Sequence, residues 1–291
     1  MATLGQTITE VADQFAQASL VYGHGTVDPW DEATALVLGV TGLPDEQHYL
    51  ETQLDPADLT RISALAGRRI DERTPIPYLV GKTTYAGMEF ECVPGVVIPR
   101  SPIAQLIAKE FRPWLLDEPA VIVDVCCGSG CLGILSAHAF PRARVVLLDI
   151  DATAVALAKR NVQAHGLAGR VEVCRSNLLD GLPAAAQPFD LLICNPPYVD
   201  AADYAALPAE YRHEPELGLA AGADGLDVVT QLLPQAADCL TARGLLVCEV
   251  GASAPALGRR FPRLAVTWVD LPDGGEGVFV VDRAALDGLE G

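Results

Sequence analysis

Basic residues are scarce in this 291-residue chain, in which 20 Lys and Arg stand against 38 Asp and Glu for a formal net charge of −18. Proteins that hold nucleic acid by its phosphates usually carry a basic face, because phosphate neutralisation supplies most of the affinity. The basic residues here are dispersed, apart from Arg68, Arg69 and Arg73. We therefore expect no direct nucleic-acid binding. An acidic surface favours a basic protein partner, although net charge can equally serve solubility alone.

Long apolar runs are also missing. Half of the residues are hydrophobic, yet no window approaches the roughly 18 uninterrupted apolar residues of a membrane-spanning helix. Residues Met1 to Gln6 contain no basic segment followed by an apolar one. The sequence therefore predicts neither a membrane span nor a secretory signal.

The eight cysteines follow no common zinc-binding spacing. Cys126, Cys127 and Cys131 crowd one segment, but no second pair of Cys or His residues lies near them in the sequence. Several other cysteines fall inside apolar, strand-like runs, where a reduced Cys behaves as a small hydrophobic residue. We therefore expect no metal site and a reduced, cytoplasmic protein.

The length favours two domains, and residues 1–80 have the pattern of the first. Apolar residues recur there at helical spacing, and an Asp followed by Pro marks two helix starts. The spacing predicts helices over Ile8–Phe15, Trp30–Leu38 and Pro56–Arg73.

Residues 81–100 change to an alternation of apolar and polar positions, which predicts a linking β-hairpin. We place its strands at Met88–Val93 and Val96–Ile98, around a Pro94-Gly95 turn. A linking helix is expected from Ser101 onward.

From residue 101 to residue 291 strand-like and helix-like segments alternate, which predicts an α/β domain with a parallel sheet covered on both faces. We expect strands at Val121–Val125, Arg144–Asp149, Val171–Arg175, Phe189–Cys194, Gly244–Val250, Leu264–Val269 and Gly277–Val281. The helices between them are expected at Cys131–Ala139, Ala152–His165, Leu226–Leu240 and Ala254–Phe261.

A glycine turn follows the first of these strands. Gly128 and Gly130 let the backbone turn tightly and approach a ligand at the start of the next helix. The third glycine of the dinucleotide fingerprint is missing. No Lys-Ser or Lys-Thr follows, which argues against a phosphate-binding P-loop.

Two further strand ends carry polar side chains suited to a nucleoside. Asp149 ends the second strand, about twenty residues after the glycines, where an acid can accept hydrogen bonds from ribose hydroxyls. Asn177 follows the third strand and can reach an adenine edge. NAD, S-adenosylmethionine and a free nucleoside all fit these features.

The segment Asn195-Pro196-Pro197-Tyr198 after the fourth strand decides among them. Two prolines stiffen the backbone at the carboxyl end of a strand, where open α/β sheets place their ligands. The Asn195 amide and the fixed carbonyls form a set of acceptors that suits a planar –NH2 group. Hydride transfer has no use for such acceptors, whereas methyl transfer to an amide or amine nitrogen does.

With these features, the sequence resembles the S-adenosylmethionine-dependent methyltransferases of the seven-stranded fold, and among them the protein-(glutamine-N5) methyltransferase family. The resemblance implies a seven-stranded, mostly parallel sheet in residues 101–291, and a small helical substrate-recognition domain in residues 1–80. The chain departs from the family pattern at Cys126, where many members have Gly, and at Asn177, where Asp is commoner. The motifs that carry the resemblance are Ile98-Pro99-Arg100, Asp124 to Cys131, Asp149, Asn195 to Tyr198, and Pro208 to Glu216 continuing to Gly222–Leu226.

Within the family, the sequence is similar to the branch that modifies a glutamine of large-subunit ribosomal protein three. Arg100 is followed by Ser101-Pro102-Ile103, where the release-factor branch usually has Pro-Asp-Thr-Glu. The segments Tyr22–Thr26, Trp30–Ala33 and Gly274–Phe279 agree with this branch. Methylation of peptide chain release factors is the first alternative. Adenine-N6 methylation of nucleic acid, which the acidic charge disfavours, and a cofactor-binding module without activity are the others.

The resemblance and the residue patterns together assign roles to individual residues. Asn195 and Pro196 are the predicted catalytic residues, because their oxygens can accept the two amide N–H groups of a glutamine. Tyr198 is expected to pack over the methyl-acceptor group or in the core, and Arg100 to hold polar groups or to form a salt bridge. His24 and His213 are interpreted as structural. The predicted substrate-binding residues are Asn195, Pro196, Pro197, Tyr198 and Arg100, and the predicted cofactor-binding residues are Asp124, Cys126, Gly128, Gly130, Asp149, Asn177 and Asn195.

Overall fold

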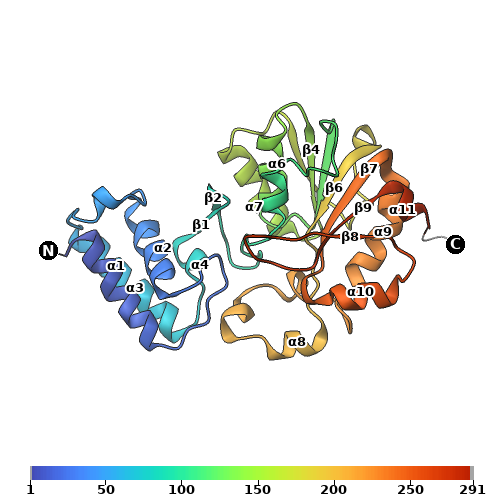
Figure 1. Cartoon of the computed structure of the whole chain (residues 1–291). Coiled ribbons are helices and arrows are strands. Elements are labelled where there is room, and N and C mark those ends of the chain that lie inside the picture. Colours follow the sequence, from blue (N-terminus) through green and yellow to red (C-terminus); the bar gives the residue numbers. More distant parts are fainter. Residues whose placement is uncertain (1, 289–291) are drawn as a thin grey trace. The chain divides into compact units, whose positions relative to one another are not determined.

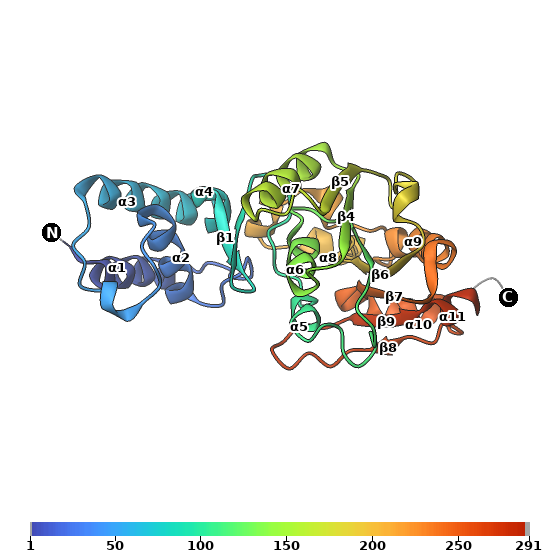
Figure 2. The same ribbon diagram turned by 90° about the horizontal axis from the view of Figure 1, so that it is seen from above.

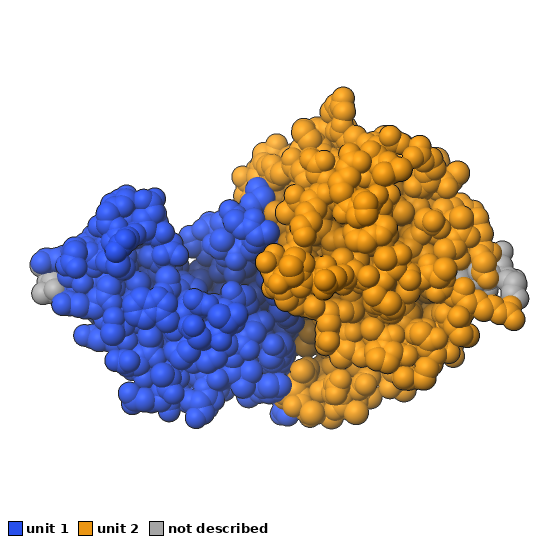
Figure 3. Space-filling view, viewed as in Figure 1, with its two compact units in different colours: residues 1–94, 98–100, 208–214 blue, residues 95–97, 101–207, 215–291 orange. Residues whose placement is uncertain are grey.

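The structure, a computed structural model, describes residues 2–288. The chain forms two compact units, coloured separately in Figure 3. Unit 1 contains residues 1–94, 98–100 and 208–214, and unit 2 contains residues 95–97, 101–207 and 215–291. Unit 1 therefore includes two segments, 98–100 and 208–214, that lie far from the N-terminal helices in the sequence. No helix among residues 2–288 is both long enough and apolar enough to span a membrane.

Unit 1 is built on helices whose starts are encoded locally. Asp28 and Asp55 cap two of them, each followed by Pro at the first helical position, as the sequence predicts. Thr3 and Gln6 form a capping box on the first helix. Apolar residues on the facing sides, among them Phe15, form the core of the unit. The helices are α1 (Leu4–Gln17), α2 (Pro29–Thr41), α3 (Pro56–Asp71), α4 (Ile76–Val80) and the 3-10 helix Gln47–Tyr49, with a second 3-10 helix at Ala209–His213 (Figure 1).

The hairpin lies in the predicted segment but pairs differently. Strands β1 (Lys82–Tyr85) and β2 (Met88–Glu91) are antiparallel and flank a two-residue turn, Ala86-Gly87. Both turn residues have positive φ, +48° and +77°, the conformation that matches the twist of paired strands. The predicted pairing around Pro94-Gly95 is wrong. The backbone near Val96–Ile98 finds other partners, since Ile98 donates its N–H to the Glu214 carboxylate at 2.9 Å.

Unit 2 contains the predicted sheet of seven strands, in the order β5-β4-β3-β6-β7-β9-β8. The first five run parallel to one another, β9 is antiparallel to β7, and β8 is antiparallel to β9. Four predicted strands have the observed bounds, whereas β7 begins earlier than expected and β8 is only two residues long. The strands are β3 (Val121–Val125), β4 (Arg144–Asp149), β5 (Val171–Arg175), β6 (Phe189–Cys194), β7 (Leu240–Glu249), β8 (Thr267–Trp268) and β9 (Val278–Asp282).

Helices cover both faces of this sheet. Figure 2 shows α5, α6 and α7 on one side and α9, α10 and α11 on the other. The linking helix expected after Ser101 is short. The helices are α5 (Ala104–Ile107), α6 (Cys131–Ala139), α7 (Ala152–Ala164), α8 (Ala201–Ala206), α9 (Asp227–Cys239), α10 (Ala254–Arg260) and α11 (Arg283–Asp287), with 3-10 helices at Ala184–Ala186, Glu216–Gly218 and Gly251–Ser253.

Candidate active site

The candidate site lies at the carboxyl ends of neighbouring parallel strands of unit 2. Val125 pairs with Leu148 of β4 on one side and with Cys194 of β6 on the other. The glycine turn after β3, Asp149 at the end of β4 and Asn195 after β6 therefore meet at one edge of the sheet. This is the edge at which open α/β sheets bind their ligands.

The two predicted glycines of the turn have different roles. Gly128 has φ +54°, and a Cβ atom there would meet only Val96, at 3.8 Å, so its surroundings are open. Gly130 has φ +81° and is the N-cap residue of α6. A Cβ atom at Gly130 would lie 3.0 Å from Leu147 and 3.2 Å from Ala158. Gly128 therefore leaves room for a ligand, whereas Gly130 lets α6 pack closely against the rest of the unit.

Asp149 ties the glycine turn to the end of β4. One carboxylate oxygen accepts the N–H of Gly128 at 2.8 Å, and the other accepts the N–H of Asp151 at 2.9 Å. Burial raises the pKa of this carboxyl above its ordinary value, against the effect of the two backbone hydrogen bonds. Each oxygen keeps a second lone pair, so the predicted hydrogen bonds to ribose hydroxyls remain compatible with this arrangement.

Asp124 faces the interior of unit 2. Its Oδ2 accepts the N–H of Gly133 at 2.8 Å, which holds the first turn of α6. Its Oδ1 is buried and has no hydrogen-bond partner among residues 2–288. The pKa of the Asp124 carboxyl is raised to about 7, chiefly because the group is buried. The charge of Asp149 also raises this pKa, and the hydrogen bond from Gly133 opposes the rise. The predicted contact between Asp124 and a cofactor stays a prediction.

Asn195 presents the clearest sign of a ligand. Its side-chain oxygen is buried and has no hydrogen-bond partner in the part of the chain that the structure describes. A buried acceptor without a partner is costly, and each such group in a native protein calls for an explanation, such as a catalytic role or a bound water. Pro196 is buried, and Pro197 and Tyr198 are half-buried. The backbone that follows Asn195 is thus held in place around an unused acceptor.

Tyr198 is fixed from three sides. Its hydroxyl group donates to Oε1 of the buried Glu249 at 2.7 Å, and its carbonyl accepts the Ser253 hydroxyl at 2.9 Å. Gly251 has φ +45°, and a Cβ atom there would come within 2.6 Å of the Tyr198 ring. The tyrosine is therefore wedged against the segment after β7. Its predicted contact with a methyl-acceptor group stays a prediction.

Two predicted cofactor residues lie at the margin of the site. Cys126 is half-buried and has φ +58°, so it begins the turn in a conformation that glycine adopts more easily. Asn177 is exposed, and its amide nitrogen donates to Asp180 at 3.2 Å. Neither geometry tests a contact with a cofactor.

Arg100 belongs to unit 1 and is held by an acid there. Its guanidinium donates two hydrogen bonds to the carboxylate of buried Glu214, at 2.6 and 2.7 Å, and one to the carbonyl of Ile98 at 3.1 Å. Burial raises the pKa of Glu214, but His24 and Arg100 outweigh it and lower this pKa to about 2. The salt-bridge interpretation of Arg100 fits this geometry. Its predicted role in substrate binding stays a prediction.

Sequence reasoning missed Glu249 and Glu214, although a signal for Glu249 exists. Glu249 is the one acid in the apolar run Leu245–Val250, at the carboxyl end of a central strand. An acid in that position is buried at the edge where the ligand binds, and it requires partners. Glu214 offers no comparable signal, since its partners are distant in the sequence.

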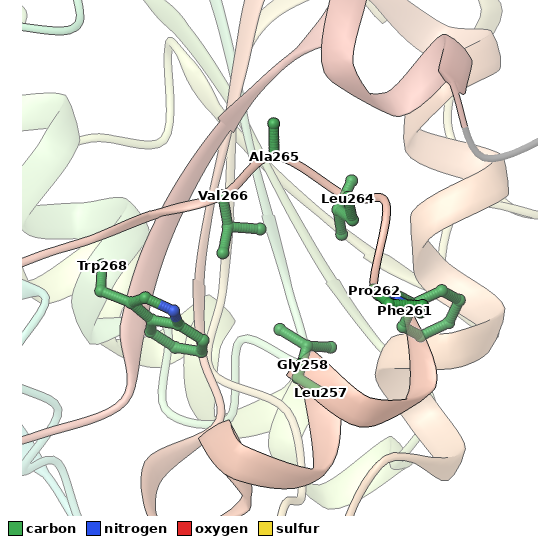
Figure 4. Close-up of a pocket in the computed structure, with 8 residues that line it drawn as sticks. All are labelled: Leu257, Gly258, Phe261, Pro262, Leu264, Ala265, Val266 and Trp268. Atoms are coloured by element: carbon green, nitrogen blue, oxygen red, sulfur yellow. The ribbon is translucent and has the colours of Figure 1, made fainter.

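A pocket of about 240 Å³ lies elsewhere in unit 2 and shares no residue with this site (Figure 4). It has an apolar lining that includes Leu257, Val266 and Trp268, so it offers little to orient a polar substrate. Among residues 2–288, no group of three His, Cys, Asp or Glu side chains is arranged to hold a metal ion.

Comparisons with known proteins identify the family. A model described as "Methyltransferase small domain" matches residues 105–209. A ribosomal protein uL3 glutamine methyltransferase from Bordetella pertussis is 40% identical over 291 residues, covering 99% of this chain and 97% of the relative. The chain belongs to this family. A protein of the same name from Francisella tularensis is 39% identical over 267 residues, covering 90% of this chain and 84% of the relative.

Solved structures support the fold. The catalytic domain of hMettl16, in complex with MAT2A 3'UTR hairpin 6, matches with a TM-score of 0.54 and 15% identity, covering 79% of this chain and 82% of that one. A second hMettl16 structure, with hairpin 1, matches with a TM-score of 0.52 and 13% identity, covering 94% and 89%. Identities this low concern the architecture alone.

The family members are methyltransferases, so this chain is an enzyme with S-adenosylmethionine as its methyl donor. The residues at the site fit this cofactor. The open space at Gly128 lets the cofactor approach the backbone closely. The Asp149 oxygens have lone pairs for the ribose hydroxyls, and the buried Asn195 oxygen has no hydrogen-bond partner among residues 2–288.

Proposed function

We propose that this enzyme transfers a methyl group from S-adenosylmethionine to the side-chain amide nitrogen of a glutamine in ribosomal protein uL3, the large-subunit ribosomal protein three. The observation that carries the proposal is the buried, unpartnered oxygen of Asn195 in a chain whose full-length relatives bear that name. An acceptor in this position suits a substrate that brings an N–H group.

The chemical difficulty is the weak nucleophilicity of an amide nitrogen, whose lone pair is delocalised into its carbonyl. In our proposal, the Asn195 side-chain oxygen accepts one N–H of the glutamine amide, and the Pro196 carbonyl accepts the other. The nitrogen is then held with its out-of-plane lobe free for the methyl group. Such alignment removes part of the barrier before the reaction begins.

The same acceptors also stabilise the transition state. Positive charge develops on the glutamine nitrogen as it takes up the methyl group. Acceptors that are already fixed by prolines and by Tyr198 stabilise this charge without reorganising, in the manner of an oxyanion hole with the sign reversed. A general base is not required beforehand, because a methylated, protonated amide loses its proton readily.

S-adenosylmethionine, when bound, supplies the electrophilic methyl group. In our proposal the backbone at Gly128 and the carboxylate of Asp149 hold it, with Asp124, Cys126, Gly130, Asn177 and Asn195 as the further residues that the sequence predicts. Asp149 already orients the glycine turn through the Gly128 N–H, so it both shapes the site and offers lone pairs to it.

We assign substrate recognition to the helical part of unit 1 and place the activity in the cytoplasm, where ribosomal proteins are made. Unit 1 contains sixteen acidic and seven basic residues, for a net charge of −9. An acidic recognition unit suits ribosomal proteins, which are basic because they bind RNA.

The proposal is tested with methyl-labelled S-adenosylmethionine. The enzyme is incubated separately with purified uL3, with release factors, and with DNA and RNA, and the labelled protein is digested and sequenced by mass spectrometry. We expect label on one glutamine of uL3. Label on a release factor instead would favour the first alternative, and label on nucleic acid alone would overturn glutamine methylation.

A further inference from the structure

Three large apolar side chains are exposed close together in the sequence of unit 1. Val21, Val27 and Trp30 are 38%, 81% and 48% exposed, and they are three of the seven large hydrophobic residues exposed among residues 2–288. Three peptide units separate Val27 from Trp30, so their Cα atoms lie within about 11 Å of each other. Isolated exposed apolar residues need no explanation, but a group of them does.

The segment that carries these residues is irregular, yet its backbone is anchored by buried charges. It joins α1 to α2, and Val21 donates its N–H to Glu210 at 3.1 Å. The Val21 carbonyl accepts from the guanidinium of Arg69 at 3.0 Å. Arg69 is fully buried and donates to Glu32 of α2 at 3.0 Å. Val21 is thus fixed at both its backbone groups.

A second anchor lies three residues further on. His24 is buried, with Nε2 3.6 Å from the Glu214 carboxylate and its ring centroid 4.5 Å from that of Tyr211. Gly23 has φ +148°, and a Cβ atom there would overlap the Tyr211 hydroxyl. A bulkier residue at this position would therefore have to displace the Tyr211 side chain or the segment. Asp28 then begins α2 by accepting the Asp31 N–H at 2.9 Å.

These anchors hold the segment in place. Buried charged side chains of unit 1 bind both backbone groups of Val21. A fixed segment loses little entropy when a partner binds, and exposed Trp residues are frequent anchors of protein interfaces.

Charge indicates the kind of partner. Asp28 and Asp31 are exposed on either side of Trp30 in the sequence, and unit 1 as a whole has a net charge of −9. A surface with an apolar centre and acidic neighbours complements a basic segment that carries an apolar or long aliphatic side chain.

We propose that Val27, Asp28, Trp30 and Asp31 form a docking surface for a basic segment of the protein substrate. This docking surface rests on the proposed function, because it takes uL3 as the substrate. It supplies affinity through residues of the substrate other than the glutamine, so it acts on substrate binding rather than on the chemical step.

The first test replaces Trp30. In the Trp30→Ala variant we expect KM for uL3 to rise at least tenfold with kcat unchanged, the pattern for an interaction that ground state and transition state share. Trp30→Phe should recover most of the affinity. The matched control is Trp268→Ala, which removes a Trp of similar exposure, 43%, from unit 2 and should leave KM unchanged.

The second test removes charge without removing the helix cap. Asn is as good an N-cap residue as Asp, so Asp28→Asn keeps α2 capped. Asp28→Asn combined with Asp31→Asn should raise KM for uL3 and weaken its dependence on salt, since exposed charges are screened by salt. Circular dichroism melting of each variant shows whether unit 1 remains folded.

Direct binding separates this proposal from the proposed function. Fluorescently labelled uL3 is titrated with the enzyme, and anisotropy gives the Kd. Wild-type affinity in Trp30→Ala, with methyl transfer to uL3 intact, overturns the docking surface alone. Binding of uL3 that weakens in Trp30→Ala, without any methyl transfer by the wild-type enzyme, supports the docking surface and overturns the proposed function. Absence of uL3 binding by the wild-type enzyme overturns both.

Discussion

Tyr198 donates its hydroxyl hydrogen to Oε1 of Glu249, with 2.7 Å between the two oxygens, in the interior of unit 2. The other carboxylate oxygen of Glu249 accepts the hydroxyl of Ser101 at 2.5 Å. Because Tyr198 ends the Asn195–Tyr198 segment, this acid holds the last residue of the proposed catalytic motif. We therefore predict that Glu249 acts as a positioning residue through Tyr198.

Removing the Tyr198 hydroxyl should slow catalysis without preventing folding. Hydrogen bonds to charged groups contribute about 1.5–3 kcal/mol, so a loosened motif in Tyr198→Phe should lower kcat roughly 10- to 100-fold. The matched control is Tyr204→Phe in α8, because the Tyr204 hydroxyl does not contact Glu249 or Tyr198 through any of these hydrogen bonds. Steady-state methyl transfer and cofactor affinity are measured together. A Tyr198→Phe variant with the kcat of wild type would show that the hydrogen bond does not position the motif.

Asn195→Ala tests the acceptor itself. Loss of one fixed hydrogen-bonding group at a transition-state site costs on the order of 10²–10³ in turnover, and we expect this loss in kcat. Asn177→Ala removes an exposed Asn that is predicted to contact only the cofactor, so it should change cofactor affinity but not kcat at saturation. Isothermal titration with S-adenosylmethionine verifies that Asn195→Ala still binds the donor. Near-normal turnover in that variant would exclude Asn195 from the chemistry.

Local sequence signals predicted the strands of the site well. Val121–Val125, Arg144–Asp149, Val171–Arg175 and Phe189–Cys194 are apolar runs with clear ends, and the structure confirms their bounds. The pairing within the hairpin was harder to predict. The hairpin prediction used the turn signal Pro94-Gly95, whereas Ala86-Gly87 forms the turn with the backbone twist that paired strands require.

The contacts that fix the N-terminal unit were outside the reach of sequence patterns. Glu210 and Glu214 lie in a segment that looks like an exposed loop, yet both are buried in unit 1 against Arg69 and Arg100. Nothing in the local composition names partners more than a hundred residues away.

Arg69 gives a prediction about the stability of unit 1. The Arg69→Met variant leaves Glu32 buried without its cation and Glu210 with Arg73 alone, at 3.5 Å. Breaking a buried ion pair in this way costs about 3–5 kcal/mol. The triple variant Arg69→Met, Glu32→Gln and Glu210→Gln removes the unpaired charges and should regain part of that loss. Urea unfolding followed by circular dichroism measures both. If the single variant unfolds at the same urea concentration as wild type, the ion cluster does not stabilise unit 1.

Asp124 predicts how stability depends on pH. Its pKa is about 7 in the folded protein, against about 3.9 for an Asp exposed to water. The folded state therefore binds the proton more tightly than the unfolded state. The free energy of unfolding therefore falls as the pH rises from about 4 to about 7. Above about pH 7 the Asp124 carboxyl is ionised in both states, so it causes no further change.

The Asp124→Asn variant isolates this effect. Asn keeps an oxygen that can accept the Gly133 N–H, but it cannot ionise. The thermal unfolding midpoint of the variant should therefore exceed that of wild type, by a margin that grows between pH 4 and 7. A shift of about three pKa units corresponds to about 4 kcal/mol at most. Melting curves are recorded without S-adenosylmethionine, and Asp238→Asn on the exposed side of α9 serves as the matched control. A margin that stays constant across this pH range would show that Asp124 is ionised throughout, and that the Gly133 hydrogen bond outweighs its burial.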